Sequence, residues 1–158
     1  MTGTTRRWVR VGLVYLTVSF LAVGLWATLD PKGFYDDFPG GGRTWVAGDG
    51  PYNAHLVGDA GVGFLAVGIV VLLAAAWMDR RLVQAACVAS AVHGALHLLY
   101  HLRHPNDALE SADTWLSNGG LAFGVAVAAV VLVTTRSGVN RSPQSQTQLR
   151  QTASERTL

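Results

Sequence analysis

Long apolar segments alternate with polar segments along this chain. The four apolar segments cover residues 11–29, 52–77, 82–103 and 114–135. Each is close to the roughly 20 residues that a helix needs to cross a hydrocarbon core about 30 Å thick. Pro51 suits the first turn of the second segment, and Pro105 ends the third because the residue before a proline disfavours the helix. The pattern predicts an all-α membrane protein with four transmembrane helices.

The polar segments indicate how these helices are connected. The turn at residues 79–81 is very short, so the second and third helices are predicted to be antiparallel neighbours in a four-helix bundle. Residues 30–50 form an outer loop rich in Gly, Pro and Asp, whose aromatic residues we expect to fold it over the mouth of the bundle as a lid. These residues are Phe34, Tyr35, Phe38 and Trp45.

The end of the chain differs in composition from the apolar segments. Residues 136–158 hold almost no large apolar side chains and are rich in Ser, Thr, Gln and Arg, which is typical of disorder. We therefore expect a transmembrane domain at residues 1–135 followed by a disordered cytoplasmic tail.

Composition agrees with this reading, and the distribution of charge adds an orientation. Half of the residues are hydrophobic, 14% are charged and the mean hydropathy is +0.30. The N-terminal segment, the turn at 79–81 and the tail hold nine of the eleven Arg, whereas the other two loops are acidic. The positive-inside rule then predicts a multi-pass protein of the plasma (inner) membrane with both termini in the cytoplasm. The expected contact is the lipid bilayer and not nucleic acid.

Tryptophans support the same orientation. Trp8 and Trp77 fall at the predicted inner interface, and Trp26 and Trp115 fall at the outer one, as the aromatic belts of membrane proteins require. Cys87 is the single cysteine, so an intramolecular disulfide and a cysteine-based zinc site are both excluded. We expect it to be an inert small residue of the core.

Four of the five histidines lie near the outer end of the third segment. At 100° per residue, His97, His101 and His104 fall about 40°, 80° and 20° from His93, so all four share one stripe of the helix. A stripe of imidazoles is costly against lipid and is expected to face a polar site. His104, beyond the apolar segment, is expected at the headgroups.

The second segment carries the complementary polar pair, His55 and Asp59, four residues apart on one helical face. Asp59 lies about 10 Å, and His97 about 9 Å, from the outer ends of their helices. If the two helices are neighbours, His55 and Asp59 face His97 and His101. These four residues are the predicted metal ligands, with His93 and Tyr100 as further cofactor-binding residues behind them.

Three imidazoles and one carboxylate suit Zn²⁺, Fe²⁺ or Cu²⁺. The chain has no Glu-x-x-His, and no Glu follows His97, so neither the di-iron carboxylate motif nor the zinc-protease motif is present. A haem held between His55 and His97 is a weaker alternative. A quinone headgroup or a proton pathway is also compatible with the residues, and so is a purely structural hydrogen bond between two helices.

Some stretches of the chain resemble a known group of proteins. They are the run from Phe34 to Gly42, the run from Pro51 to Asp59, and His97-Leu98-Leu99-Tyr100-His101. With them, residues 8–135 look like a group of small, largely uncharacterised four-helix membrane proteins of actinobacteria, and more distantly like DoxX-like membrane proteins. The resemblance implies the architecture. Because some DoxX-like proteins are associated with quinone-linked redox chemistry, it also favours a redox role.

The sequence leaves three functions open. The first is binding of a transition metal or redox cofactor at the His/Asp site, which would allow oxidoreductase chemistry. The second is a non-catalytic accessory or assembly subunit with structural histidines, joined to a membrane partner or to a second copy through the Gly-rich segment 52–77. The third is a small proton-coupled carrier, which is less favoured because no inverted repeat or broken helix is evident.

Overall fold

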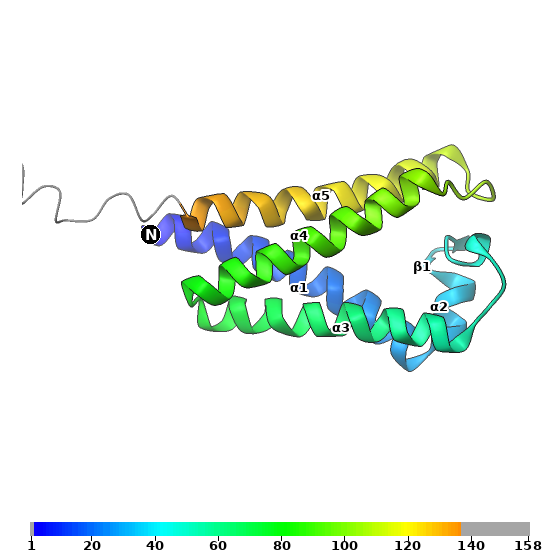
Figure 1. Cartoon of the computed structure of the whole chain (residues 1–158), viewed down its shortest axis with the longest axis horizontal. Coiled ribbons are helices and arrows are strands. Elements are labelled where there is room, and N and C mark those ends of the chain that lie inside the picture. Colours follow the sequence, from blue (N-terminus) through cyan, green and yellow to red (C-terminus); the bar gives the residue numbers. More distant parts are fainter. Residues whose placement is uncertain (1, 137–158) are drawn as a thin grey trace, which may run out of the picture.

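The computed structural model describes residues 2–136, which are mostly helical (Figure 1). Within this range, four helices are long and apolar enough to cross a membrane. They are α1 (Gly3–Leu29), α3 (Ala54–Trp77), α4 (Arg80–Arg103) and α5 (Ser111–Arg136). The four predicted segments are thus confirmed as helices. Apart from Arg136, the predicted disordered tail lies outside the described residues.

The helices begin at their capping residues and not at the limits of the apolar segments. Thr2, Asn53 and Asp79 each accept a hydrogen bond from a backbone N–H of the first turn, at 3.3, 3.1 and 2.9 Å, before α1, α3 and α4. Such a cap is worth about 1 kcal/mol. α1 begins at Gly3, well before residue 11, because Thr2 caps it there. The polar residues between this cap and the apolar segment are therefore helical too. α4 ends at Arg103, just before His104 and Pro105, as predicted.

Glycines allow α1 and α3 to approach closely. A Cβ atom added at Gly24 would lie 2.7 Å from the backbone nitrogen of Leu65, and one added at Gly61 would lie 2.8 Å from that of Thr28. α3 packs most extensively on α1, and α4 packs most extensively on α5. Gly61 and Gly68 of α3 therefore serve a contact with α1 inside the chain.

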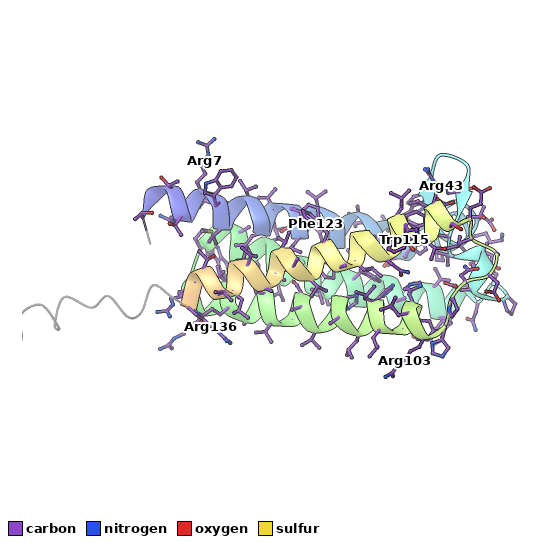
Figure 2. All side chains as sticks on the ribbon, turned by 90° about the horizontal axis from the view of Figure 1, so that it is seen from above. Arg7, Arg43, Arg103, Trp115, Phe123 and Arg136 are labelled. Atoms are coloured by element: carbon purple, nitrogen blue, oxygen red, sulfur yellow. The ribbon has the colours of Figure 1, made fainter. Side chains whose placement is uncertain are left out.

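The core is small, and the outward faces of the helices are apolar. Leu13, Leu16, Val71, Val83 and Cys87 are the largest fully buried side chains, so Cys87 is a core residue as expected. Large apolar side chains such as Val18, Val92 and Phe123 are exposed on the outside (Figure 2). An exposed apolar surface of this extent is typical of helices that contact lipid.

The segment after α1 is folded, although the sequence predicted a loop there. It contains α2 (Pro31–Asp37), two short antiparallel strands β1 (Pro39–Gly40) and β2 (Arg43–Thr44), and the 3₁₀ helix η1 (Ala47–Asp49). We call residues 31–50 the cap. The predicted outer loop holds regular structure because Asp30 accepts a hydrogen bond from the Gly33 backbone N–H at 2.9 Å, and Pro31 occupies the first turn, which together start a helix.

Aromatic rings hold the cap against α1. Phe34 and Phe38 lie 4.6 Å apart between ring centroids, and both contact Trp26 of α1, at 5.9 and 6.1 Å. Trp45 packs on Phe38 at 5.9 Å. The cap lies at one end of the long axis, while the start of α1, the end of α5 and the α3–α4 turn lie at the other (Figure 1).

Candidate functional site

α4 brings three of the predicted histidines together in a column along its inner side, formed by His93, His97 and His101. The rings of His93 and His97 are stacked, with centroids 5.9 Å apart and planes 26° from parallel. The Nε2 atoms of His97 and His101 lie 3.0 Å from each other, within hydrogen-bond distance. All three side chains are half-buried. We call these residues the histidine column.

The deep end of the histidine column is surrounded by aromatic rings. His93 contacts Phe64 of α3 and Phe20 of α1 edge-on, with centroids 4.6 and 5.3 Å away. Phe64 also contacts His97, at 5.8 Å. Among the described residues, the buried Nε2 atom of His93 has no hydrogen-bond partner. An unpaired polar atom in an apolar site is costly, so this nitrogen is suited to a polar ligand.

Asp49, at the end of η1 in the cap, interacts electrostatically with His101 at the outer end of the column. Partial burial raises the pKa of the Asp49 carboxyl, whereas the nearby charge on His101 and a hydrogen bond with Asn106 act in the opposite direction. Asp49 is therefore in electrostatic contact with His101. The cap adds an acidic group to the column that its own helix does not carry.

Asn106, in the connection between α4 and α5, holds the cap in this position. Its Nδ2 donates to the Trp45 carbonyl at 3.1 Å, and its Oδ1 accepts from the Ala108 backbone N–H at 3.0 Å. A Cβ atom added at Gly48 would lie 2.5 Å from both polar atoms of the Asn106 side chain. Glycine at position 48 therefore makes room for the Asn106 amide.

Two further contacts tie down the cap. The Tyr35 hydroxyl donates to the carbonyl of Gly50 at 2.7 Å, which closes the cap on itself. The Arg43 guanidinium reaches Asp113 of α5, with 2.7 Å between Nε and Oδ1. Arg43 belongs to the cap, which follows α1, and Asp113 belongs to α5. This ion pair therefore links the cap to the pair of helices formed by α4 and α5.

Tyr100 and His104 lie beside the outer end of the histidine column, where the Tyr100 ring meets that of His101 edge-on with centroids 6.1 Å apart. Tyr100 is exposed, and its ring stacks on that of His104 with centroids 4.5 Å apart. Both residues line a hollow of about 260 Å³ at the outer end, together with Asp49 and Asn106. His104 is thus at the surface, as expected, whereas Tyr100 does not lie behind the column with His93.

His55 and Asp59 form a separate pair. Their Nε2 and Oδ2 atoms lie 3.3 Å apart, and their side chains are 88% and 67% exposed. Within residues 2–136, no group of three or more His, Cys, Asp or Glu side chains is placed to hold a metal ion. The expected convergence of this pair with His97 and His101 is therefore not what the structure has.

The physical reason lies in how α3 is rotated. Gly61 and Gly68 turn one face of α3 onto α1, where added Cβ atoms would collide with Thr28 and Leu21. Counting 100° per residue, His55 lies about 120° to 140° from these glycines and so points outward. α3 and α4 also diverge from their short turn toward the cap end (Figure 1). A short turn makes α3 and α4 neighbours, but it does not determine which face of each helix meets the other.

Sequence reasoning missed Asp49, Asn106 and Phe64 as residues of the site. Asp49 entered the sequence analysis only as one of the acidic residues of the outer loops, and no pattern links it to His101. A signal for Asn106 did exist, because Asn directly after His104-Pro105 is a typical turn residue whose side chain bonds to nearby backbone.

The chemistry of the column follows from its two closest imidazoles. Each neutral imidazole has one donor and one acceptor nitrogen, so the Nε2 atoms of His97 and His101 can share a proton. The same two atoms can instead both ligate one cation, because neutral histidine is a common metal ligand.

The fold defines the class of this protein as a multi-pass helical membrane protein. No protein-family model, no curated protein and no solved structure matches the chain. The resemblance to DoxX-like membrane proteins therefore stays a prediction.

Proposed function

We propose that the protein is an antiparallel four-helix bundle of the plasma (inner) membrane, with the cap outside and both termini in the cytoplasm. Arg7 and Arg136 lie at the end opposite the cap, and Trp115 lies at the cap end (Figure 2). This separation of basic and capped ends matches the positive-inside rule. In a Cys87→Ala background, Gly41→Cys should react with a membrane-impermeant maleimide added to intact cells, and Arg7→Cys should not. The reverse labelling would overturn this orientation.

We further propose that the outer half of the bundle binds a transition-metal ion through His97 and His101. The observation that supports this is the 3.0 Å distance between their Nε2 atoms. Two nitrogens, each about 2.0–2.1 Å from one ion, lie about 2.9 Å apart at a right angle and about 3.4 Å apart at a tetrahedral angle. The 3.0 Å spacing lies near both values, so the pair suits Cu²⁺ or Zn²⁺, and copper is the ion tested below.

The residues around this pair fit such an ion. Asp49 interacts electrostatically with His101, and it can offset the charge of the ion from the cap side. His93 stacks on His97 and fixes the orientation of its ring. Copper bound there would supply one-electron chemistry, so we propose a redox role for this site.

Copper binding can be measured on protein purified in mild detergent. Addition of Cu²⁺ should give near-stoichiometric binding and an electron paramagnetic resonance spectrum with nitrogen hyperfine structure. The double variant His97→Ala/His101→Ala should lose both. The matched control is His104→Ala, an exposed histidine of the same helix end, which should bind copper as the wild type does. Equal copper uptake by the wild type and the double variant would contradict the proposal.

A quinone headgroup is the second candidate ligand. The observation that favours it is the unpaired, buried Nε2 of His93 between Phe20 and Phe64, since a single polar group among aromatic rings suits a quinone carbonyl. A short-chain quinone should then protect the protein against heat, and His93→Phe should abolish this protection while leaving copper binding intact. The same protection in the variant would exclude His93 as the contact. A haem between His55 and His97 has no support in their positions.

A further inference from the structure

Exposed arginines gather at the end of the molecule opposite the cap. They come from the beginning of α1, from the start of α4 and from the last residue of α5. Figure 2 shows Arg7 and Arg136 at this end, and the turn that leads into α4 lies there too (Figure 1). We call these residues the arginine collar, and its members are Arg6, Arg7, Arg10, Arg80, Arg81 and Arg136.

Two parts of the collar are joined by a hydrogen bond between α4 and α5. The Nε atom of Arg80 donates to the Thr135 carbonyl at 3.0 Å. The guanidinium of Arg80 is therefore held beside the last turn of α5, which ends with Arg136.

The α1 part of the collar lies at the same level. A Cβ atom added at Gly12 would lie 2.8 Å from Cγ2 of Val131, so these two positions of α1 and α5 are in contact. Arg6 is about 9 Å along α1 from Gly12, and Arg136 is about 8 Å along α5 from Val131. Because both distances run toward the end opposite the cap, three helices present their arginines at one level (Figure 1).

The charge of the collar is not balanced by the protein. Within residues 2–136, none of its arginines forms an ion pair with an acidic side chain, whereas Lys32 and Arg43 of the cap pair with Asp36 and Asp113. Asp79, the acid beside the collar, accepts the capping hydrogen bond of α4. Residues 137–158 hold three Arg and one acidic residue, so they add positive charge. The counter-charge has to come from another molecule.

Helix electrostatics also call for an anion at this end. Arg80 and Arg81 lie in the first turn of α4, where the backbone N–H groups carry a partial positive charge that disfavours cations. Arg6 and Arg10 are four residues apart in α1, and like charges at this spacing repel each other. An anion over the collar would relieve both effects.

Tryptophans place the collar at the depth of lipid headgroups. Trp8 lies between Arg7 and Arg10, and Trp77 lies three positions before Arg80. Both side chains are exposed, by 69% and 66%, and exposed tryptophans of membrane helices are enriched at the membrane–water interface. The planar guanidinium matches the geometry of a phosphate group, which it can bind through two N–H groups at once. We propose that the arginine collar binds the phosphate groups of anionic phospholipids in the adjacent leaflet.

This proposal is independent of the metal site, because the collar and the histidine column lie toward opposite ends of the bundle. It is also independent of orientation, because the same lipids would be bound from either leaflet. Loss of copper binding in the His97→Ala/His101→Ala variant therefore says nothing about the collar.

Lipid retention by protein purified in mild detergent tests the proposal. The protein is mixed with equimolar phosphatidylglycerol and phosphatidylcholine that carry the same acyl chains, and the bound lipids are counted by native mass spectrometry. The wild type should retain the anionic lipid over the zwitterionic one by about tenfold, and added NaCl should lower this preference because exposed charges are screened. Equal retention of the two lipids would overturn the proposal.

The variant Arg6→Gln/Arg7→Gln/Arg10→Gln removes half of the collar. These side chains are exposed and form no ion pair within the described residues, and glutamine is nearly as good a helix former as arginine, so the fold should persist. The preference for phosphatidylglycerol should fall several-fold. An undiminished preference would contradict binding by the collar.

The matched control is Lys32→Gln/Arg43→Gln/Arg103→Gln, which removes the same charge at the cap end. It should keep the preference of the wild type, and an equal fall in both variants would show that net charge alone decides. Excess inorganic phosphate, compared with NaCl at equal ionic strength, should not displace the bound lipid. Full displacement by phosphate would assign the collar to free phosphate and not to phospholipids.

Discussion

Single residues decide how the mouth of this molecule is closed. Asn106 makes three polar contacts with one short side chain: to the Trp45 carbonyl, to the Ala108 backbone N–H and to Asp49. Gly48 lies directly against its amide. These contacts join the cap to the connection between α4 and α5. We therefore expect one methyl group added at position 48 to affect the attachment of the whole cap.

We expect Gly48→Ala to loosen the cap. The added Cβ would lie 2.5 Å from the Asn106 amide, which must rotate away and lose its bond to Trp45. Losing a partly buried hydrogen bond of this kind costs about 1–3 kcal/mol. Limited proteolysis of the detergent-solubilised protein should therefore cut within residues 38–50 faster than in the wild type.

Gly119→Ala is the control for this change, because an added Cβ at Gly119 has nothing within 4 Å. It should leave the proteolysis rate unchanged. An unchanged rate in Gly48→Ala would show that Asn106 does not hold the cap.

At the scale of helices, the close contact between α1 and α3 sets the rotation of α3. The added Cβ atoms at Gly24 and Gly61 meet backbone atoms of the facing helix, which cannot move aside as a side-chain end can. The same contact directs His55 and Asp59 outward. Close packing of α1 and α3 at their glycines thus sets both the spacing of these helices and the outward direction of this pair.

Gly61→Ala should separate these two helices. Its Cβ would lie 2.8 Å from the Thr28 nitrogen and 3.0 Å from the Ala27 carbonyl carbon, so the backbones must move apart. Overpacking of this kind costs about 1–3 kcal/mol, which should appear as a lower midpoint of thermal unfolding.

Gly124→Ala, in the interior of α5, meets nothing within 4 Å and is the matched control. Because alanine has the higher helix propensity, its midpoint should equal or exceed that of the wild type. If Gly61→Ala were equally stable, the α1–α3 contact would be looser than the glycines indicate.

At the scale of the whole molecule, the cap joins the two halves of the chain. Arg43 belongs to the cap, which follows α1, and Asp113 belongs to the first turn of α5. A partly exposed ion pair adds little stability, about 0–1 kcal/mol. Its main effect is to keep the cap next to α5 at the mouth of the bundle.

Arg43→Ala should therefore change access more than stability. The midpoint of thermal unfolding should stay close to that of the wild type, whereas copper should load faster at His97 and His101, as measured by stopped-flow absorbance. Lys32→Ala is the matched control, because it removes another exposed ion pair, the one with Asp36 inside α2, without freeing the cap. Equal loading rates in both variants would show that the Arg43–Asp113 pair does not limit access.

The sequence predicts the elements of this fold better than it predicts their rotation. The apolar segments and Pro105 locate the long helices, since length, hydropathy and the restriction before proline are local properties. The pairing of His97 with His101 also follows from a four-residue spacing on one helix. The direction of His55 depends instead on which face of α3 meets α1, a choice that is made by contacts between segments distant in the chain.

The same distinction explains the cap. Asp30-Pro31 is a helix start that a search for capping residues can find, although glycines and prolines nearby suggest a loop. The electrostatic interaction between Asp49 and His101 joins residues of two separate segments, and no local pattern encodes it.

Asp30 connects the cap to α1 through both its backbone and its side chain. Its backbone N–H bonds to the Trp26 carbonyl at the end of α1, and its side chain bonds to Gly33 at the start of α2, so one residue is the whole joint between two helices. A joint this short leaves little freedom between α1 and α2, whereas the cap edge at the side of Asn106 and Asp113 is attached through side-chain contacts. A ligand would therefore enter from one direction, between the cap and the α4–α5 connection, and the contacts at Asn106 and Arg43 would act together as its latch.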